Sequence, residues 1–499
     1  MTKQEKEKRL SDWIFKYSAY FMALNVINFD KMTVAPEGGN QYIDDRAAFL
    51  SGELFSIQSD PDMIELLREL KDDDEIDPDY KRMSELYYEE AMKLQCVPKD
   101  VFVEWQKLLY TSHNHWLDAK KKSDYSIFEP YLKKVIAMQK QIIEYRESDM
   151  SVFDQLLSDY EPGMTEKKYD EFFNALKGAI PDLIKKVNAA KPVDDAIVYL
   201  NYDINGQKEY MKELLDYLHF NKSWSYQGET EHPFTTWFCK NDCRTTTKYL
   251  EDNAISAILS TVHECGHAWY AHNVDDKYDG TILLDGVSYG MHESQSRLCE
   301  NYLGRSRAFW EYNFPVLKRI FPDQLGQASL DDFVKAINVS RPSLVRTEAD
   351  ELTYPMHILI RYEIEKGLFN GTISTEGLDK TWNEMYKKYL GVDVTSDREG
   401  ILQDDHWADG CLGYFPTYAL GTAFAAQFMH KMRQEIDVDD LLRNGHYDKV
   451  MEWLKNNIQH YGRRYDADWV IQHATGEPFN PQYFIDYLTD KYTKLYNFD

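Results

Sequence analysis

Apolar positions spaced three and four residues apart dominate the first part of the chain. From residue 5 to about 190 this spacing runs through long segments such as YKRMSELYYEEAMKLQ (80–95) and YLKKVIAMQKQIIEYRESDM (131–150). Short polar breaks, such as KDDDEIDPDY and EPGMT, separate these segments. One apolar face per helical turn is typical of amphipathic helices, and Pro and Gly mark the turns between them. The pattern predicts a helical N-terminal lobe over about 1–190.

The pattern changes between residues 196 and 250. AIVYLNYDI (196–204) and CRTTTKYL (243–250) are rich in β-branched and aromatic residues, which favour strands. Helical spacing resumes at Asn253 and continues almost to the C-terminus. We expect an all-α, mainly helical fold with a small β-sheet, whose strands and remaining helices occupy about 191–499. Because the sequence shows no internal repeat and no flexible linker, we expect 1–499 to be a single domain with two helical lobes around a groove.

Composition indicates a folded core and restricts the partners. Apolar residues make up 43% and aromatic residues 14%, which is typical of compact globular proteins. The formal net charge of −27, without a local basic stripe, argues against binding to nucleic acid. Charges interrupt every apolar stretch before about 18 residues, so we expect no membrane span. Residues 1–30 lack the pattern of a secretion signal, and the six sparse cysteines favour free thiols in a reducing cytoplasm.

The stretch TVHECGHAWY (261–270) carries the first candidate chemistry. His263 and His267 are four residues apart, so on a helix their imidazoles lie on one face and can share a tetrahedral metal ion. Glu264 would then reach a metal-bound water, as in the His-Glu-x-x-His pattern of zinc peptidases. Five positions are too few to establish a metal site, because two buried histidines with satisfied hydrogen bonds give the same pattern.

The surrounding sequence, NAISAILSTVHECGHAWYAHNV, supports a helix because its apolar residues recur at helical spacing and it contains no proline. Gly266 is the exception, since glycine costs about 1 kcal/mol relative to alanine inside a helix. We expect another element to pack closely against the backbone at this glycine.

A third metal ligand is expected from SYGMHESQSRLCENYLGRSRAFW (288–310). Glu293, Arg297 and Glu300 form one stripe of a single predicted helix. The alternative is an ordinary solvated ion pair on a helix surface. The run of polar residues from His292 to Arg297 favours a metal site, since such groups are costly inside an apolar core. We predict that Glu293 binds the ion and that water takes the fourth position, as at catalytic zinc.

These motifs and others together resemble those of the carboxypeptidase Taq family of metallocarboxypeptidases. The resemblance rests on HECGH, HESQSR, HPFT (232–235), DCRTT (242–246), RTEAD (346–350) and GILQDDHW (400–407), with further similarity in FDKMTVAPEGG (29–39) and ATGEPFNP (474–481). The sequence departs from the family pattern at Cys299 and Asp405.

The resemblance implies a helical fold with a deep groove like that of neurolysin-like peptidases, and a single metallocarboxypeptidase domain. It implies zinc, one Zn²⁺ per chain, with Co²⁺ or Mn²⁺ as substitutes. It also implies a homodimer that removes single amino acids from peptide substrates with a free C-terminus.

The candidate catalytic residues follow from this chemistry. Glu264 would take a proton from a zinc-bound water and pass it to the leaving amine. The tetrahedral intermediate needs further hydrogen-bond donors, each typically contributing about 3–4 kcal/mol to lowering the barrier. His406, Tyr414 and Tyr418 are the candidates, and a packed aromatic cluster is the alternative interpretation.

Substrate recognition requires a group that binds the terminal carboxylate. A guanidinium binds a carboxylate through two hydrogen bonds, and the resemblance assigns this task to Arg346. Arg244 is the second candidate, with Asp242 and Thr246 shaping the closed end of the groove. The HPFT motif adds His232 to the substrate-binding set. We also expect Asp350 and Glu351 to orient Arg346 or a ligand histidine.

Two other functions remain open at this point. A related zinc endopeptidase or oligopeptidase would share the metal and Glu264 but have a groove open at both ends. A non-catalytic helical scaffold would use the histidines only structurally.

Overall fold

The structure of the protein is a computed structural model that describes residues 1–498. The N-terminal helices are separated by the predicted polar breaks. Asp77 caps α4 and Pro78 occupies its first turn, while the Thr165 side chain caps α8. The helices of this part are α1 (Lys3–Thr33), α2 (Asn40–Gln58), α3 (Pro61–Lys71), α4 (Pro78–Gln95), α5 (Lys99–Lys122), α6 (Glu129–Glu144), α7 (Val152–Tyr160) and α8 (Glu166–Ala189).

The segment after α8 differs from the prediction. CRTTTKYL contains all but the first residue of strand β3 (Asp242–Thr247), but the strand predicted at AIVYLNYDI was wrong. Residues Ala196–Tyr199 form a turn of 3-10 helix, and α9 (Ile204–Tyr217) begins at the end of the segment. The side chains of Val198 and Tyr202 are buried in the helical core, and Asp203 caps α9. Burial of these apolar residues among helices therefore replaces strand pairing.

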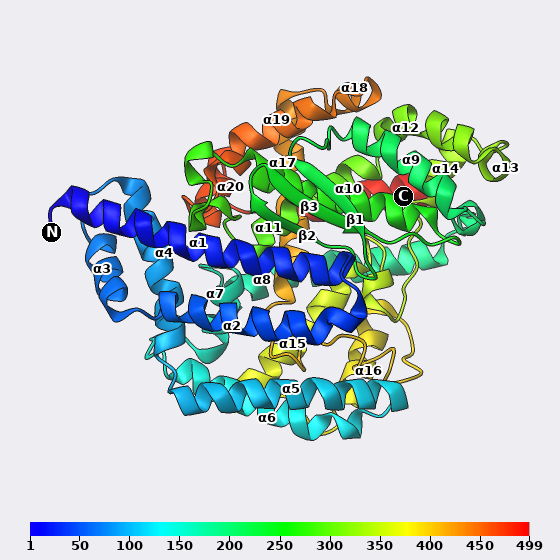
Figure 1. Ribbon diagram of the computed structural model, residues 1–499. Helices are drawn as coiled ribbons and strands as arrows, with labels where there is room; N and C mark the ends of the chain where they lie inside the picture. Colours follow the sequence, from blue (N-terminus) through cyan, green and yellow to red (C-terminus); the bar gives the residue numbers. More distant parts are fainter. Residues whose placement is uncertain (499) are drawn as a thin grey trace.

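A small sheet covers the helix that carries the two histidines. Its strands β1 (Ser225–Glu229), β3 and β2 (Thr235–Cys239) lie in the order β1-β3-β2, with β1 parallel and β2 antiparallel to β3. Both β2 and β3 contact α10 (Ala254–Asn273), and Figure 1 shows the sheet beside this helix. The sheet therefore brings side chains from DCRTT and the end of HPFT next to the HECGH motif.

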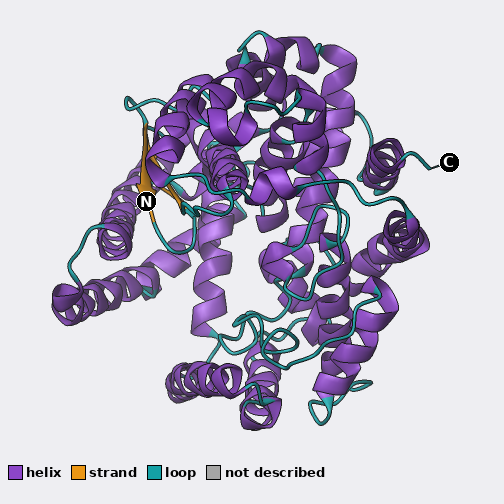
Figure 2. Ribbon diagram, turned by 90° about the vertical axis from the view of Figure 1, so that its right-hand side faces the viewer, coloured by secondary structure: helices purple, strands orange, loops and turns teal. Residues whose placement is uncertain are grey.

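The remaining helices complete a mainly helical fold with one small sheet, as predicted (Figure 2). They are α11 (Tyr289–Arg297) with a π-helical extension (Leu298–Gly304), α12 (Arg307–Ile320), α13 (Pro322–Leu325), α14 (Leu330–Ala336), α15 (Tyr354–Asn370), α16 (Leu378–Leu390), α17 (Pro416–Glu435), α18 (Val438–Arg443), α19 (Tyr447–Asn457), α20 (Ala467–Thr475) and α21 (Gln482–Tyr496). One connected set of buried apolar side chains reaches from Leu10 in α1 to Tyr496 in α21.

The two halves of the sequence are interleaved in space. Helix α15 packs against α6, α7 and α8, and α21 packs against α8, so late helices lie beside early ones (Figure 1). The loop that contains QDDHW is also held by N-terminal helices. The Trp116 indole donates to the Leu402 carbonyl at 3.1 Å, and the Gln139 amide donates to the Gly410 carbonyl at 3.0 Å. The first 190 residues therefore help to position residues far along the chain.

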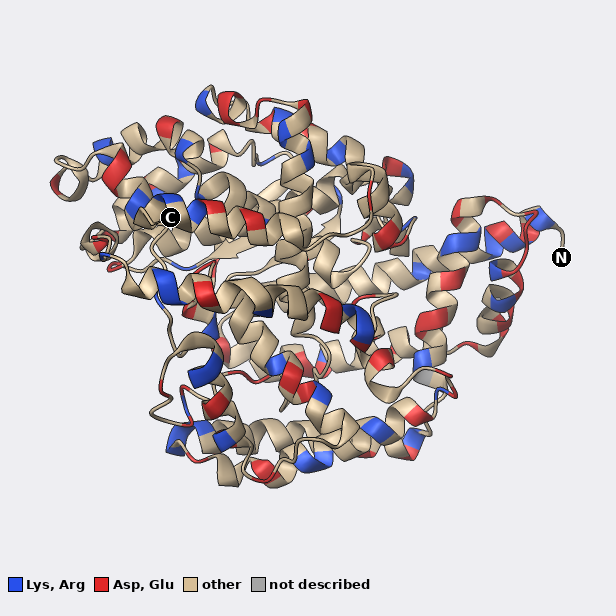
Figure 3. Cartoon of the chain, turned by 180° about the vertical axis from the view of Figure 1, so that it is seen from behind, with Lys and Arg blue, Asp and Glu red and all other residues tan. Residues whose placement is uncertain are grey.

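Charged residues are distributed over the outer helices. Figure 3 shows Lys and Arg interspersed with Asp and Glu on the face seen there, without a continuous basic strip. Among the described residues, no helix has both the length and the apolar character that a membrane crossing requires.

Candidate metal centre and carboxylate-binding network

Helix α10 brings the two histidines of HECGH together. Its first turn is capped by Asn253, whose side chain accepts from the Ser256 amide at 3.1 Å. The rings of His263 and His267 lie 5.0 Å apart on one face of the helix. A Cβ at Gly266 would lie 2.7 Å from the Gln295 carbonyl oxygen. The expected close approach is therefore present, and the approaching element is α11.

This approach places Glu293 of α11 against both histidines. Glu293 Oε2 lies 3.7 Å from His263 Nε2 and 3.5 Å from His267 Nε2. One candidate ligand atom from each residue lies within 4.8 Å of the others. Ligands about 2.0–2.1 Å from a tetrahedral zinc ion are about 3.3 Å apart, so the observed separations fit such an ion. Two imidazole nitrogens and one carboxylate oxygen are also ligands that zinc commonly takes.

Buried charges hold Glu293 in this orientation. Arg297 Nε donates to Glu293 Oε1 at 2.6 Å, while Oε2 faces the histidines and accepts from the Ser296 hydroxyl at 3.0 Å. Burial alone would raise the pKa of the Glu293 carboxyl, but Arg297 and His263 hold that pKa well below its ordinary value. The Glu293 and Arg297 side chains are only 11% and 19% exposed, so a solvated surface ion pair is ruled out.

Glu300 gives His263 a hydrogen-bond partner that the sequence did not assign. The expected stripe does not stay on one α-helix, because α11 ends at Arg297 and Glu300 lies on the π-helical extension. There Glu300 Oε2 lies 2.9 Å from His263 Nδ1 and accepts from Arg297 Nη1 at 3.1 Å. A carboxylate on the far nitrogen fixes the ring and directs Nε2 toward a metal. π-helical turns occur frequently at functional sites.

His292 performs the corresponding task for His267. Their Nδ1 atoms lie 2.6 Å apart, and the His292 ring stacks on Trp237 with centroids 4.9 Å apart. Burial, assisted by the nearby His267, lowers the pKa of His292 to about 3. A neutral His292 can accept the Nδ1 proton of His267, which leaves His267 Nε2 free to bind a cation.

Glu264 lies beside the candidate ligands and is held by the HPFT segment. The Thr235 hydroxyl donates to Glu264 Oε2 at 2.5 Å and lies 3.0 Å from the Glu264 carbonyl oxygen. Burial raises the pKa of the Glu264 carboxyl above its ordinary value, although His263 and the Thr235 hydrogen bond oppose this rise. A raised pKa suits a group that must both accept and donate a proton near neutral pH.

The DCRTT strand shapes the turn that carries Thr235. Thr246 Oγ1 accepts from the Phe234 amide at 3.0 Å and pairs with the Thr230 hydroxyl at 2.7 Å. His232 has an exposed side chain, and its carbonyl accepts from Thr230 at 2.8 Å. Thr246 therefore acts on the HPFT turn, and the described contacts of His232 come from its backbone.

Arg244 is already paired with an acid of its own strand. Its Nε and Nη2 donate to the two carboxylate oxygens of Asp242 at 2.8 Å each. The guanidinium also lies 4.4 Å above the Phe238 ring. The charges of Arg244 and Asp242 therefore cancel, and the pair presents no net positive charge to a ligand.

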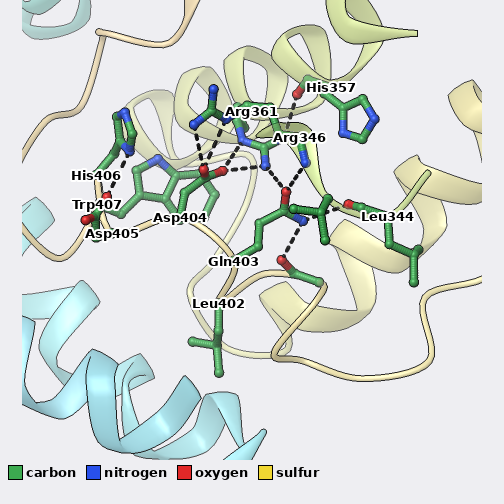
Figure 4. Close-up of polar contacts among 12 residues, drawn as sticks. Leu344, Arg346, His357, Arg361, Leu402, Gln403, Asp404, Asp405, His406 and Trp407 are labelled. Atoms are coloured by element: carbon green, nitrogen blue, oxygen red, sulfur yellow. Dashed lines mark hydrogen bonds and ion pairs between the residues drawn. The ribbon is translucent and has the colours of Figure 1, made fainter. Parts of the chain in front are cut away.

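Arg346 belongs to a buried network that the loop residue Asp404 organises (Figure 4). Asp404 Oδ1 accepts from Arg346 Nε at 3.0 Å and from Nη2 at 2.9 Å. Asp404 Oδ2 accepts from Arg361 Nε at 2.8 Å and from Nη2 at 2.5 Å. Gln403 accepts from the Arg346 amide at 2.7 Å and from Arg361 Nη2 at 2.9 Å. The QDDHW loop is therefore tied to two arginines from different elements.

Tyr354 connects this network with the metal centre. Its hydroxyl accepts from Arg346 Nη1 at 3.1 Å, and its ring lies 4.9 Å below the Arg297 guanidinium that holds Glu293. Asp350 and Glu351 do not take the orienting role expected for them. Asp350 accepts from backbone amides of its own loop, and Glu351 pairs with Lys491 at 2.5 Å.

The three proposed donors form an aromatic cluster between these groups. Tyr414 lies 5.0 Å from Tyr418 and 5.7 Å from His406 by ring centroids, and Tyr418 lies 5.3 Å from the Arg346 guanidinium. Burial raises the pKa of Tyr414 to about 12, with a contribution from the negative charge of Glu293. Both tyrosines are therefore neutral O–H donors near neutral pH, since burial also raises the pKa of Tyr418.

Gly421 of α17 packs closely against α11, so a substitution there tests whether this packing positions Glu293. A Cβ at Gly421 would lie 2.7 Å from the Gly290 carbonyl oxygen and 2.8 Å from Glu293 Cβ. We expect Gly421→Ala to push Glu293 away from the histidines and to lower zinc affinity by about 10–100-fold, as removal of other supporting groups does. Competition with a fluorescent zinc chelator measures this.

Gly178 is the matched control, because a Cβ added in α8 meets nothing within 4 Å. Gly178→Ala should leave zinc affinity unchanged and stabilise α8 by up to about 1 kcal/mol. Parental zinc affinity in Gly421→Ala would mean that this packing does not position Glu293.

Comparison with known proteins places these features in one family. Residues 9–492 match the model of the carboxypeptidase Taq (M32) metallopeptidases. Carboxypeptidase 1 of Bacillus subtilis is 41% identical over 98% of both chains, and thermostable carboxypeptidase 1 of Thermus thermophilus is 34% identical over 96% of this chain and 97% of that protein. The crystal structure of an M32 carboxypeptidase from Deinococcus radiodurans superposes with a TM-score of 0.96 at 29% identity, covering 99% of this chain and 100% of that one.

Proposed function

Since the chain belongs to the carboxypeptidase Taq (M32) family and is therefore a metallocarboxypeptidase, a peptide hydrolase, we propose that it removes single amino acids from the free C-terminus of peptides. The family implies a divalent metal. The observation that carries the proposal is the grouping of His263, His267 and Glu293 beside Glu264.

We propose zinc as the metal, with cobalt or manganese as substitutes, held by the two His Nε2 atoms and Glu293 Oε2. A bound zinc ion supplies a Lewis acid that polarises the peptide carbonyl and lowers the pKa of water. Glu300 and His292 fix the two imidazole rings through their Nδ1 atoms. The protein therefore contributes the ligands and the groups that keep them oriented.

Glu264 moves the proton in this proposal. Its carboxylate takes a proton from the attacking water and later delivers it to the leaving amine. The Thr235 hydroxyl holds Oε2, so the second carboxylate oxygen is the one that exchanges the proton. His406, Tyr414 and Tyr418 donate hydrogen bonds to the oxyanion of the tetrahedral intermediate.

Arg346 is preferred over Arg244 as the residue that binds the terminal carboxylate. Both arginines already pair with an acid. Arg244 and Asp242 cancel each other, whereas Asp404 is shared by Arg346 and Arg361, which leaves one positive charge uncompensated. A carboxylate ligand is more favourable beside a surplus positive charge than beside a neutral pair. We propose that Arg244, Asp242 and His232 line the substrate groove, whereas the buried Thr246 acts through the HPFT turn.

Peptides with a blocked C-terminus test the activity. We expect rapid release of the last residue from a free-acid peptide and little cleavage of the same peptide as its C-terminal amide, because the amide lacks the charge that Arg346 binds. Mass spectrometry of a peptide mixture digested by the enzyme should show successive losses from the C-terminal end. Undiminished cleavage of the amide, at internal bonds, would instead support an endopeptidase.

The assembly and location belong to the same proposal. We infer a homodimer from the family resemblance and a cytoplasmic location from the cysteines, all six of which are free as predicted. Sedimentation velocity of the purified enzyme should give a species of twice the chain mass of 58.8 kDa.

A further inference from the structure

The network around Asp404 contains more positive than negative charge. Arg346, Arg361 and Asp404 have side chains that are 10%, 0% and 12% exposed. Asp404 binds Arg346 through Oδ1 and Arg361 through Oδ2 (Figure 4). Buried charges are stable only when they are compensated, and one carboxylate cannot compensate two guanidinium groups.

Neighbouring groups do not supply the missing negative charge. His357 lies against Arg361, and burial together with the two arginines lowers the pKa of this histidine, which keeps it neutral. Lys120 donates to the Gln403 carbonyl at 2.9 Å and adds positive charge. Asp405 lies 3.2 Å from His406, its side chain is half exposed, and the described contacts of the two arginines with acids are all to Asp404.

The remaining nearby acid, Glu365, binds other groups. It accepts from the Trp407 indole at 2.7 Å and from the Gly413 amide at 3.0 Å. Both of its oxygens are therefore engaged away from the two arginines, and burial raises the pKa of Glu365 to about 7 against the nearby charge of Arg361. The surplus positive charge therefore persists in the protein without a ligand.

The two arginines differ in what they can still bind. Arg361 donates to Asp404, Gln403, the His357 carbonyl and Tyr386, and its side chain has no exposed surface. Arg346 directs two N–H groups at Asp404 and one at Tyr354. A guanidinium has five N–H groups, so Arg346 retains donors for a carboxylate. Arg361 cannot touch a substrate, whereas Arg346 can.

We propose that Arg361 is a positioning residue for substrate recognition: it engages half of the Asp404 carboxylate, so that the charge of Arg346 stays available to the α-carboxylate of the peptide. This inference rests on the proposed function of Arg346. Asp404 orients Arg346, and Arg361 prevents Asp404 from neutralising it. The terminal carboxylate of the substrate is the counter-charge that completes the network.

Charge-changing variants separate this role from simple packing. Arg361→Met leaves Arg346 fully neutralised by Asp404, Asp404→Asn leaves two uncompensated positive charges, and the double variant has the parental surplus of one. Binding of a tripeptide as free acid and as C-terminal amide is measured calorimetrically, at low salt, with zinc-loaded protein. All variants carry Glu264→Gln, so that neither ligand is cleaved.

The ratio of free-acid to amide affinity should follow the summed charge of the side chains at positions 346, 361 and 404. We expect it to fall about tenfold in Arg361→Met, to rise about tenfold in Asp404→Asn, and to return to the parental value in the double variant. Arg361→Lys should keep most of the parental ratio because it keeps the charge. If Arg361→Met does not fold, the rise in Asp404→Asn still tests the idea, since a purely orienting Asp404 would give a fall.

The outcomes distinguish this inference from the proposed function. Equal binding of acid and amide by the Glu264→Gln parent would contradict carboxylate recognition itself. A parent that prefers the acid, together with an unchanged ratio in folded, zinc-loaded Arg361→Met or a fall in Asp404→Asn, would overturn only the role of Arg361.

Discussion

Glu264→Gln should retain stoichiometric divalent metal and lose peptidase activity by about 10²–10⁴-fold, the usual contribution of a positioned acid-base group. The amide of glutamine can still accept the Thr235 hydrogen bond, and the three candidate ligands are unchanged. It cannot take a proton from water. Activity is measured as kcat on a free-acid peptide, and metal content by mass spectrometry of the same sample.

Glu251→Gln is the control for this substitution, because Glu251 is exposed just before α10. It should keep both metal and activity. If Glu264→Gln hydrolysed peptides at the parental rate with its metal in place, Glu264 would not be the base. If it lost the metal as well, its role would be structural.

Arg346→Ala is expected to raise the KM for free-acid peptides by about 10–100-fold, which corresponds to the loss of hydrogen bonds to a charged group. The KM for the slowly cleaved amides should change little, because they offer no charge to bind. The fold should survive, since Asp404 keeps Arg361 as its partner. Steady-state kinetics on matched acid and amide peptides measure the difference.

Arg244→Ala is the matched control, since it also removes a guanidinium paired with one carboxylate. It should affect acid and amide peptides equally. Arg346→Ala could instead affect both substrates equally while Arg244→Ala affects only the acid. Arg244, and not Arg346, would then be the residue that binds the terminal carboxylate.

Local spacing predicted much of the fold and of the metal group. The i, i+4 histidines, the apolar stripe of α10 and the polar run around Glu293 all depend on neighbours within one helix, which a sequence displays directly. Gly266 even indicated the close approach of another element, which the structure identifies as α11. The same local view failed at AIVYLNYDI, where burial against other helices decides the structure.

The groups that orient the site depend on long-range contacts. Glu300 reaches His263 because the chain continues beyond Arg297 as a π-helix. The spacing of Glu293, Arg297 and Glu300 in the sequence does not reveal this change from α-helix to π-helix. The pairing of Asp404 with Arg346 and Arg361 joins segments about 40–60 residues apart. The sequence could indicate that QDDHW matters, but not which of its residues holds which arginine.

Metal analysis tests the central claim most directly, namely that His263, His267 and Glu293 together hold one divalent cation. The protein is purified without chelator, alongside a variant in which these three residues are replaced by alanine. We predict close to one divalent ion per chain in the parent, loss of ion and activity with chelator, recovery with zinc or cobalt, and little metal in the variant. A parent without stoichiometric metal whose activity zinc and cobalt do not restore, or a variant that binds as much metal as the parent, would contradict the account.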